Sequence, residues 1–172
     1  AGLGQTVSVT MAVLAARMGG LALGAVLIAP RVGRIARPLA VYGFLELAIA
    51  FGAGLVAPGL AFLHRLDLRL VDPGGAGPWS LFALGGLMLL LMPITMMMGA
   101  TFPLLVRIES EAGRSAGAAL GRIAAVSTAG AVAGTLLAGF VMVEELGLSG
   151  TVHASRVTGT LVGIVAVLMS RF

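Results

Sequence analysis

The chain has 172 residues, of which 59% are hydrophobic and 10% are charged, and its mean hydropathy is +1.08. About 25% of the residues in a typical soluble domain are charged, so this composition excludes an ordinary soluble domain and predicts an integral membrane protein in contact with the lipid bilayer. The eleven basic residues are all arginine and give a net charge of +4. Because they form no basic face, we expect no nucleic-acid partner. The absence of cysteine excludes disulfides and cysteine metal sites.

Two apolar stretches open the chain, and each contains one charged residue. Residues 5–29 predict a membrane-spanning helix that contains Arg17 and ends at Pro30, because proline cannot continue a helix. Residues 39–63 predict a second span, with Glu46 in its interior.

The third predicted span covers residues 79–106 and follows a connection, residues 64–78, that ends in a Pro-Gly-rich tract. Trp79 stands at the start of this span, where an interfacial aromatic residue is expected. Pro93 lies in its interior and predicts a kink.

The last two predicted spans are separated by a short turn. A charged loop over residues 107–115 leads into the fourth span, residues 117–143, whose one charged residue is Arg122. The turn over residues 144–150 leads into the fifth span, residues 151–170. No span alternates apolar and polar residues, which excludes a transmembrane barrel. The predicted fold class is an all-α membrane protein, a single-domain bundle of about five transmembrane helices.

The arginines predict how the chain is oriented. The loops at residues 30–38 and 107–116, together with the C-terminal end, hold six arginines, whereas the connection at residues 64–78 holds two arginines beside two acids. Positively charged loops stay in the cytoplasm, so we expect these two loops and the C-terminus to be cytoplasmic. The arginine-rich, lysine-free composition favours a bacterial source and thus a multi-pass protein of the bacterial inner membrane.

Glycines recur at four-residue spacing within the expected spans: Gly20 and Gly24, Gly117 and Gly121, Gly130 and Gly134, and Gly159 and Gly163. This spacing places small residues on one face of a helix, where a neighbouring backbone can approach closely. We expect these glycines to pack against neighbouring helices. A specific dimerisation face is the alternative interpretation.

Several short runs resemble a known membrane domain. They are GGLALGAVL at 19–27, YGFLEL at 42–47, GATFPLL at 99–105 and AGF at 138–140. Together they resemble the multi-helix membrane domain that is fused to spermidine synthase-like (polyamine aminopropyltransferase-like) enzymes. In that family the chemistry belongs to a soluble synthase domain attached after the membrane domain. That domain is absent from this sequence, so we expect a fragment or subunit that is not itself an enzyme.

Three charged residues inside the predicted spans form a candidate intramembrane polar site: Arg17, Glu46 and Arg122. A charge in hydrocarbon costs several kcal/mol unless it is paired or hydrated, so the three side chains are expected to meet if their helices pack together. One interpretation is an internal ion pair that fixes helix packing. The other is a site that binds a substrate or relays protons.

A second polar group is expected at the opposite end of the bundle. Glu144 and Glu145 precede the fifth span, and His153 and Arg156 lie within its first turns, so a rim cluster of salt bridges is predicted. Met88, Met92 and Met96 share a helix face, which favours core packing over a Cu(I) site. We expect no catalytic residues, no cofactor and no metal site.

These observations leave two functional hypotheses for the chain itself, and a third in which it is part of an enzyme whose catalytic aminopropyltransferase domain lies outside this sequence. The first is a non-catalytic membrane scaffold that docks beside other membrane subunits as an accessory part of a larger complex. The second is a transporter-like domain that binds or delivers a polyamine or another small amine, the ligand class that the family resemblance implies.

Overall fold

The computed structural model describes residues 2–70 and 81–171, and within these residues all regular structure is helical. The helices are α1 (Gly2–Val32), α2 (Pro38–Leu70), α3 (Leu81–Glu111), α4 (Ala116–Leu137), a π-helical segment η1 (Ala138–Met142), and α5 (Val143–Met169). The predicted all-α fold class is confirmed.

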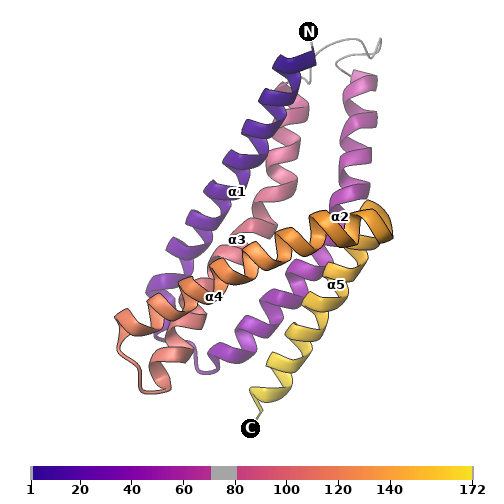
Figure 1. Ribbon diagram of the computed structural model, residues 1–172. Helices are drawn as coiled ribbons and strands as arrows, with labels where there is room; N and C mark the ends of the chain where they lie inside the picture. Colours follow the sequence, from indigo (N-terminus) through magenta and orange to yellow (C-terminus); the bar gives the residue numbers. More distant parts are fainter. Residues whose placement is uncertain (1, 71–80, 172) are drawn as a thin grey trace.

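Four helical segments are long and apolar enough to cross a membrane: Thr10–Val32, Pro38–Leu66, Leu84–Glu111 and Ala116–Met169. The predicted count of about five is not confirmed, because α4, η1 and α5 form one continuous helical run of 54 residues. This run reverses direction near Gly147 (Figure 1), which has a φ of 68° and a ψ of 177° inside the stretch assigned to α5. Glycine adopts a positive φ without a steric penalty, so the reversal occurs at a residue that tolerates it.

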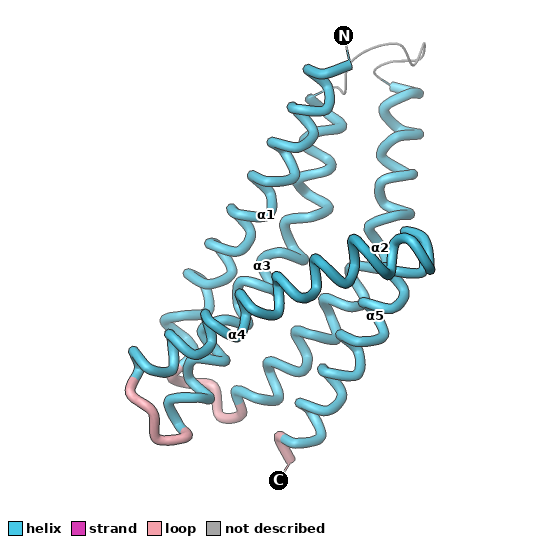
Figure 2. Tube along the Cα trace, in the orientation of Figure 1, coloured by secondary structure: helices cyan, strands magenta, loops and turns pink. Residues whose placement is uncertain are grey.

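The short loops lie at one end of the molecule (Figure 2). Residues 33–37 connect α1 to α2, residues 112–115 connect α3 to α4, and the chain's C-terminal end is found at the same end. The arginine-rich loops therefore share one end, as the sequence predicts. Which side of a membrane this end faces stays a prediction.

Helices α1 and α3 pack backbone against backbone. A Cβ atom added to Gly24 would overlap the backbone of Met96, and one added to Gly99 would overlap the backbone of Leu21. Thr95 adds a polar contact, since its hydroxyl donates to the carbonyl oxygen of Ala16 on α1 at 3.2 Å as well as lying near carbonyl oxygens of its own helix. Small residues thus allow the close approach, and a part-buried hydroxyl supports it.

Helices α2 and α5 form a second close pair. A Cβ at Gly43 would lie 2.7 Å from the carbonyl oxygen of Gly163, and a Cβ at Gly163 would lie 2.9 Å from the carbonyl oxygen of Gly43. Farther along, a Cβ at Gly159 would be 3.5 Å from the Cβ of Ala50. Helix α2 also contacts α3, so α1, α3, α2 and α5 form a continuous layer of packed neighbours.

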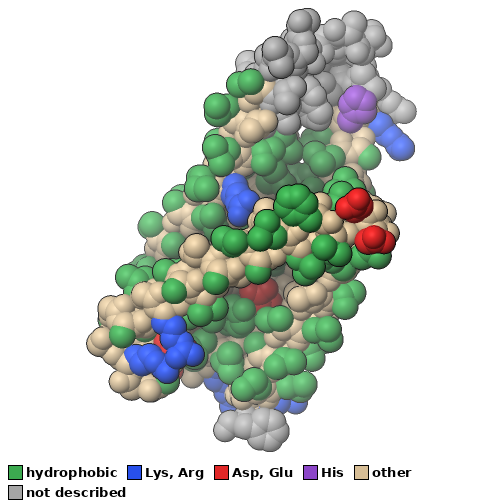
Figure 3. All heavy atoms as spheres, in the orientation of Figure 1, with side chains coloured by type: hydrophobic (Ala, Val, Ile, Leu, Met, Phe, Trp, Pro, Cys, Tyr) green, Lys and Arg blue, Asp and Glu red, His purple; other side chains and the backbone are tan. Residues whose placement is uncertain are grey.

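Helix α4 crosses this layer obliquely instead of joining it (Figure 1). Its only buried residue is Ala119, and its contacts within the described part of the chain are with α3 and η1. Figure 3 shows this face, where hydrophobic side chains and backbone cover α4 and basic side chains gather at its lower end. The helix is thus a long apolar element with few partners.

Several predicted boundaries differ from the structure. Helix α1 runs two residues past Pro30, and α2 continues through Pro58 to Leu70. The expected loop at residues 107–115 is helical as far as Glu111, where an ion pair one turn apart supports the last turn. Backbone groups that are shielded from water must bond within their own segment, which favours continued helix through isolated prolines.

The turn predicted for residues 144–150 is helical except at Gly147. The Pro-Gly-rich tract and the predicted interfacial position of Trp79 lie outside the described residues.

Candidate functional site

A cavity of about 620 Å³ lies between the packed layer and α4. Its charged lining residues are Arg17 from α1 and Glu46 from α2, and its polar ones include Thr101 from α3 and Ser127 from α4. Helices α1, α2, α3 and α4 each contribute at least one side chain. A volume in this range is typical of small-molecule sites, which reach about 300–1,000 Å³.

The helical repeat explains why these residues face the cavity. On α1, Arg17, Leu21 and Ala25 recur every four residues and so lie on one face. On α3, Met98, Phe102 and Leu105 are spaced four and three residues apart, so they also share one face and supply an apolar wall. The cavity therefore has charged groups on two helices and hydrocarbon between them.

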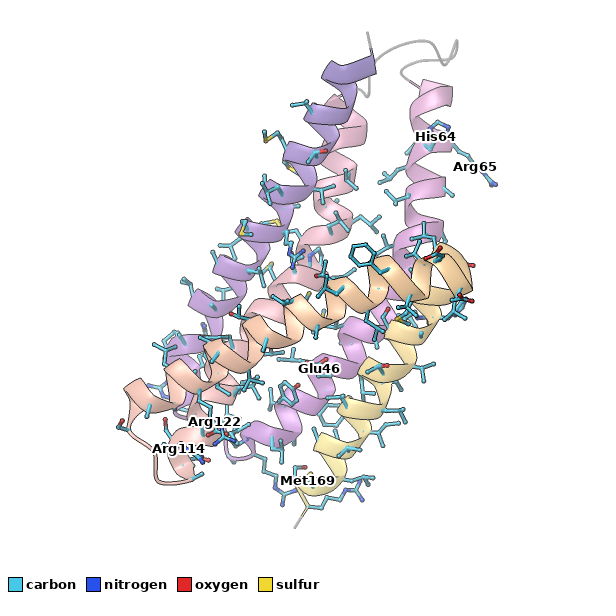
Figure 4. All side chains as sticks on the ribbon, viewed as in Figure 1. Glu46, His64, Arg65, Arg114, Arg122 and Met169 are labelled. Carbon is cyan, nitrogen blue, oxygen red and sulfur yellow. The ribbon has the colours of Figure 1, made fainter. Side chains whose placement is uncertain are left out.

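Glu46 lies well inside the bundle, away from the loops (Figure 4). Its side chain is half-buried, and the hydroxyl of Tyr42, one helical turn earlier, hydrogen-bonds to its carboxylate. Among the described residues Glu46 has no arginine or histidine nitrogen within 4.0 Å. The carboxylate has one neutral partner and faces an open cavity.

Arg17 lines the same cavity but does not pair with Glu46. Packing at the helix interfaces explains the separation, because Gly20 lies against Thr95 while Gly52 lies against the adjacent Ile94. Arg17 lies three residues before Gly20 on α1, and Glu46 lies six residues before Gly52 on α2. Because α1 and α2 run in opposite directions, these two offsets add. Nine residues of helical rise, about 13 Å, therefore separate the two positions along the bundle.

Arg122, the third member of the predicted site, lies elsewhere. Its Nε is 3.8 Å from the carboxylate of Glu109, whose other partner is Arg114 at 2.7 Å. Figure 4 shows Arg122 and Arg114 together at the loop end of the molecule, away from Glu46. A helical side chain leans toward the N-terminus of its helix, and on α4 that direction leads to the loop and not to the cavity.

A second cavity of about 550 Å³ lies near this loop end. Arg107 and Ser110 supply its polar lining, and Phe102 lines both this cavity and the central one. Arg107 pairs with Glu111 at 2.7 Å through Nε, while its Nη1 is buried and has no hydrogen-bond partner among the described residues. The aromatic ring of Phe102 thus stands between the loop end and the Arg17–Glu46 cavity.

The salt bridges predicted for the rim cluster are not formed among the described residues. His153 and Arg156 line shallow pockets together, but Arg156 turns inward, and its Nε donates to the carbonyl oxygen of Ala50 at 3.2 Å. Within the described ranges no ion pair joins either of these residues to Glu144 or Glu145, whose side chains are exposed. The close packing of Arg156 against Gly54 explains the difference, because it holds the guanidinium against α2.

The predicted packing glycines fall into two groups. Gly20, Gly24, Gly159 and Gly163 lie at helix contacts, whereas a Cβ at Gly117, Gly121, Gly130 or Gly134 would meet no described atom within 4 Å. Sequence reasoning missed Gly43 and Gly99, whose close partners are on other helices. It also missed Tyr42 and Ser127. The only signal for Tyr42 is its position one helical turn from Glu46, and the only signal for Ser127 is its position on the side of α4 that faces the cavity.

No metal-binding group can be built from three or more His, Asp or Glu side chains in residues 2–70 and 81–171. The methionines predicted to fill the core lie on α3, where the backbone of Met96 contacts Gly24. The candidate site is therefore the central cavity, in which Arg17 and Glu46 lie at positions about 13 Å apart along the bundle.

These features define an all-helical protein with four segments apolar enough to span a membrane and a charged cavity among its helices. No protein-family model, no curated protein and no solved structure matches the chain. The likeness to the membrane domain of spermidine synthase-like proteins stays a prediction from the sequence.

Proposed function

We propose that this chain is a non-catalytic membrane domain, resembling the membrane part of spermidine synthase-like proteins, that serves as an accessory subunit of a larger membrane complex. It crosses the bacterial inner membrane five times, with its C-terminus in the cytoplasm. The run from α4 to α5 has 54 residues, about 80 Å of helix at 1.5 Å per residue. That length is more than twice a bilayer core of about 30 Å, and the reversal near Gly147 allows two crossings.

The observation that carries the accessory role is the unpartnered small-residue face of α4. A Cβ added to Gly130 or Gly134 would meet no described atom within 4 Å, whereas the glycine pairs of α1 and α5 lie at contacts with other helices. Small residues on a membrane helix permit a second helix to approach closely and gain van der Waals contact. A helix from another membrane subunit would complete on α4 the packing that α1, α2, α3 and α5 find among themselves.

This proposal is tested by replacing small residues on α4 with large ones. In native membranes, Gly130→Leu and Gly134→Leu should release the chain from its complex, as seen by native gel electrophoresis after mild detergent extraction. Gly19→Leu is the matched control, since Gly19 is equally open but lies on α1. A wild-type chain that migrates as a solitary monomer, or a complex that survives both α4 substitutions, would refute the accessory role.

A second candidate function is the binding or delivery of a small ligand, with a polyamine or other small amine as the class implied by the family resemblance. The observation in its favour is a carboxylate, Glu46, that faces a cavity of about 620 Å³ without an ion pair. Glu46→Gln should weaken amine binding by about tenfold or more, the loss of one charged contact. Glu145→Gln, an exposed carboxylate outside the cavity, is the control; equal amine binding by both variants would remove this candidate.

A further inference from the structure

The arrangement of charges in the central cavity points to a more specific ligand than an amine. We propose that the cavity binds an elongated zwitterion, with its carboxylate at Arg17, its ammonium at Glu46 and its hydrocarbon middle against the apolar wall between them. This inference rests on the second candidate function, ligand binding in the cavity, and specifies which ligands fit.

The first step is that both charges face one cavity and neither neutralises the other. Arg17 and Glu46 line the same space of about 620 Å³, yet no nitrogen of Arg17 lies within 4.0 Å of a Glu46 oxygen. Two opposite charges inside an apolar bundle gain strongly from pairing. An unpaired arrangement therefore leaves one cationic and one anionic position available to a ligand.

The second step is the distance between those positions. The helix register separates Arg17 and Glu46 by about 13 Å along the bundle. Helical side chains lean toward the N-terminus of their own helix, so on these antiparallel helices the two side chains do not close this separation, and a bridging ligand must hold its charged groups several methylene groups apart. An α-amino acid, whose two charged groups share one carbon, is too short, and a lipid headgroup has the same limitation. A linear ω-amino acid has the required length.

The third step is the chemistry of the wall. Apart from Thr101 and Ser127, the rest of the lining is apolar and includes Leu21, Ile49 and Phe102, which suits a methylene chain. A linear diamine would place its second ammonium beside the Arg17 guanidinium, where like charges repel. A fatty acid would leave Glu46 without a partner. Only a ligand with opposite charges at its two ends satisfies both residues.

The test compares probes of equal length that differ in end charge. Binding of 6-aminohexanoate, 1,6-diaminohexane and hexanoate to the purified chain in detergent would be measured by equilibrium dialysis with radiolabelled probes. The expected result is saturable binding of 6-aminohexanoate, about tenfold or more tighter than either other probe, and weaker by at least about tenfold in both Arg17→Gln and Glu46→Gln. The controls Arg34→Gln and Glu145→Gln, outside the cavity, should bind like the wild type.

The outcomes separate this inference from the candidate function beneath it. If 1,6-diaminohexane binds more tightly than 6-aminohexanoate and Arg17→Gln does not weaken it, the cavity binds amines and the zwitterion proposal is overturned. If none of the probes binds, both ideas fail. Repeating the dialysis in nanodiscs with and without phosphatidylethanolamine tests for a lipid occupant; displacement of 6-aminohexanoate by this lipid would also overturn the proposal. Circular dichroism of each variant confirms that it is folded.

Discussion

The α2–α5 interface and the free face of α4 use the same small residues with opposite results. At the interface, Gly43 and Gly163 each lie within van der Waals reach of the other's backbone. On α4, Gly130 and Gly134 have the same four-residue spacing as Gly159 and Gly163 of α5, but a Cβ there would meet no described atom within 4 Å. Glycine spacing therefore indicates that another helix can approach closely. Whether a helix of the same chain does so depends on the side chains around the glycines.

The difference lies in the residues around the glycines. Between α2 and α5, the larger side chains Leu47 and Val167 flank the glycines, and Arg156 crosses to a carbonyl oxygen of α2. The large apolar side chains of α4 are mostly exposed, and no hydrogen bond joins this helix to the packed layer among the described residues. A small-residue helix without such flanking contacts gains little from its own chain, so it is available to another helix.

The largest effect is expected where backbones already touch. Gly24→Leu would drive a side chain into the backbone of Met96, and neither helix can move without losing the α1–α3 contact. We expect a loss of about 3 kcal/mol in the free energy of unfolding, measured by titration from mild detergent into sodium dodecyl sulfate with circular dichroism. Gly19→Leu on the same helix meets open space, and similar destabilisation by both would break the distinction between packed and free glycines.

An intermediate effect is expected at the polar bridge of the packed interface. Arg156→Met keeps an unbranched side chain that reaches the position of Nε, but it removes the guanidinium and its hydrogen bond to the carbonyl oxygen of Ala50. Interhelical hydrogen bonds in membrane proteins contribute about 0.6 kcal/mol on average and up to about 1.7 kcal/mol, so we expect a loss of about 1 kcal/mol in the same unfolding titration. A variant as stable as the wild type would show that Arg156 does not join α2 to α5.

The smallest effect on the isolated chain is expected on α4. Gly134→Ala adds a methyl group that meets no described atom, and alanine favours helix over glycine. The free energy of unfolding should therefore stay within about 0.5 kcal/mol of the wild-type value or rise slightly. Marked destabilisation in the purified monomer would mean that α4 packs against its own chain, and the comparison with the α2–α5 interface would no longer hold.

The sequence predicts those parts of the molecule that depend on local pattern. Long apolar stretches predict the helices, and the arginine runs predict that residues 30–38 and 107–116 share one end. The bundle brings Arg17 and Glu46 to one cavity, but the meeting of their side chains that the sequence predicts is not observed. These features follow from periodicity and composition, which a single helix carries by itself.

The other features depend on the directions of side chains and on contacts between helices, and the pattern of a single helix does not predict these. The cost of an unpaired charge in hydrocarbon predicts Arg122 near Glu46, but its side chain leans toward the start of α4 and meets Glu109. Gly43 has no glycine four residues away, and its partner Gly163 lies on another helix. The open glycines on α4 have the same spacing as packed ones, so only the arrangement of the helices in space distinguishes them.

The claim on which the account depends is that the run from α4 to α5 crosses the bilayer twice and leaves α4 as a span with few close contacts among the described residues. The chain has no cysteine, so single cysteines at Arg65, Ser115, Glu145 and Arg171 can be labelled without background by a membrane-impermeant maleimide in intact cells and in inverted vesicles. We predict labelling of Ser115→Cys and Arg171→Cys from the cytoplasmic side only, and of Arg65→Cys and Glu145→Cys from the opposite side only. Labelling of Ser115→Cys and Glu145→Cys from the same side would contradict the account.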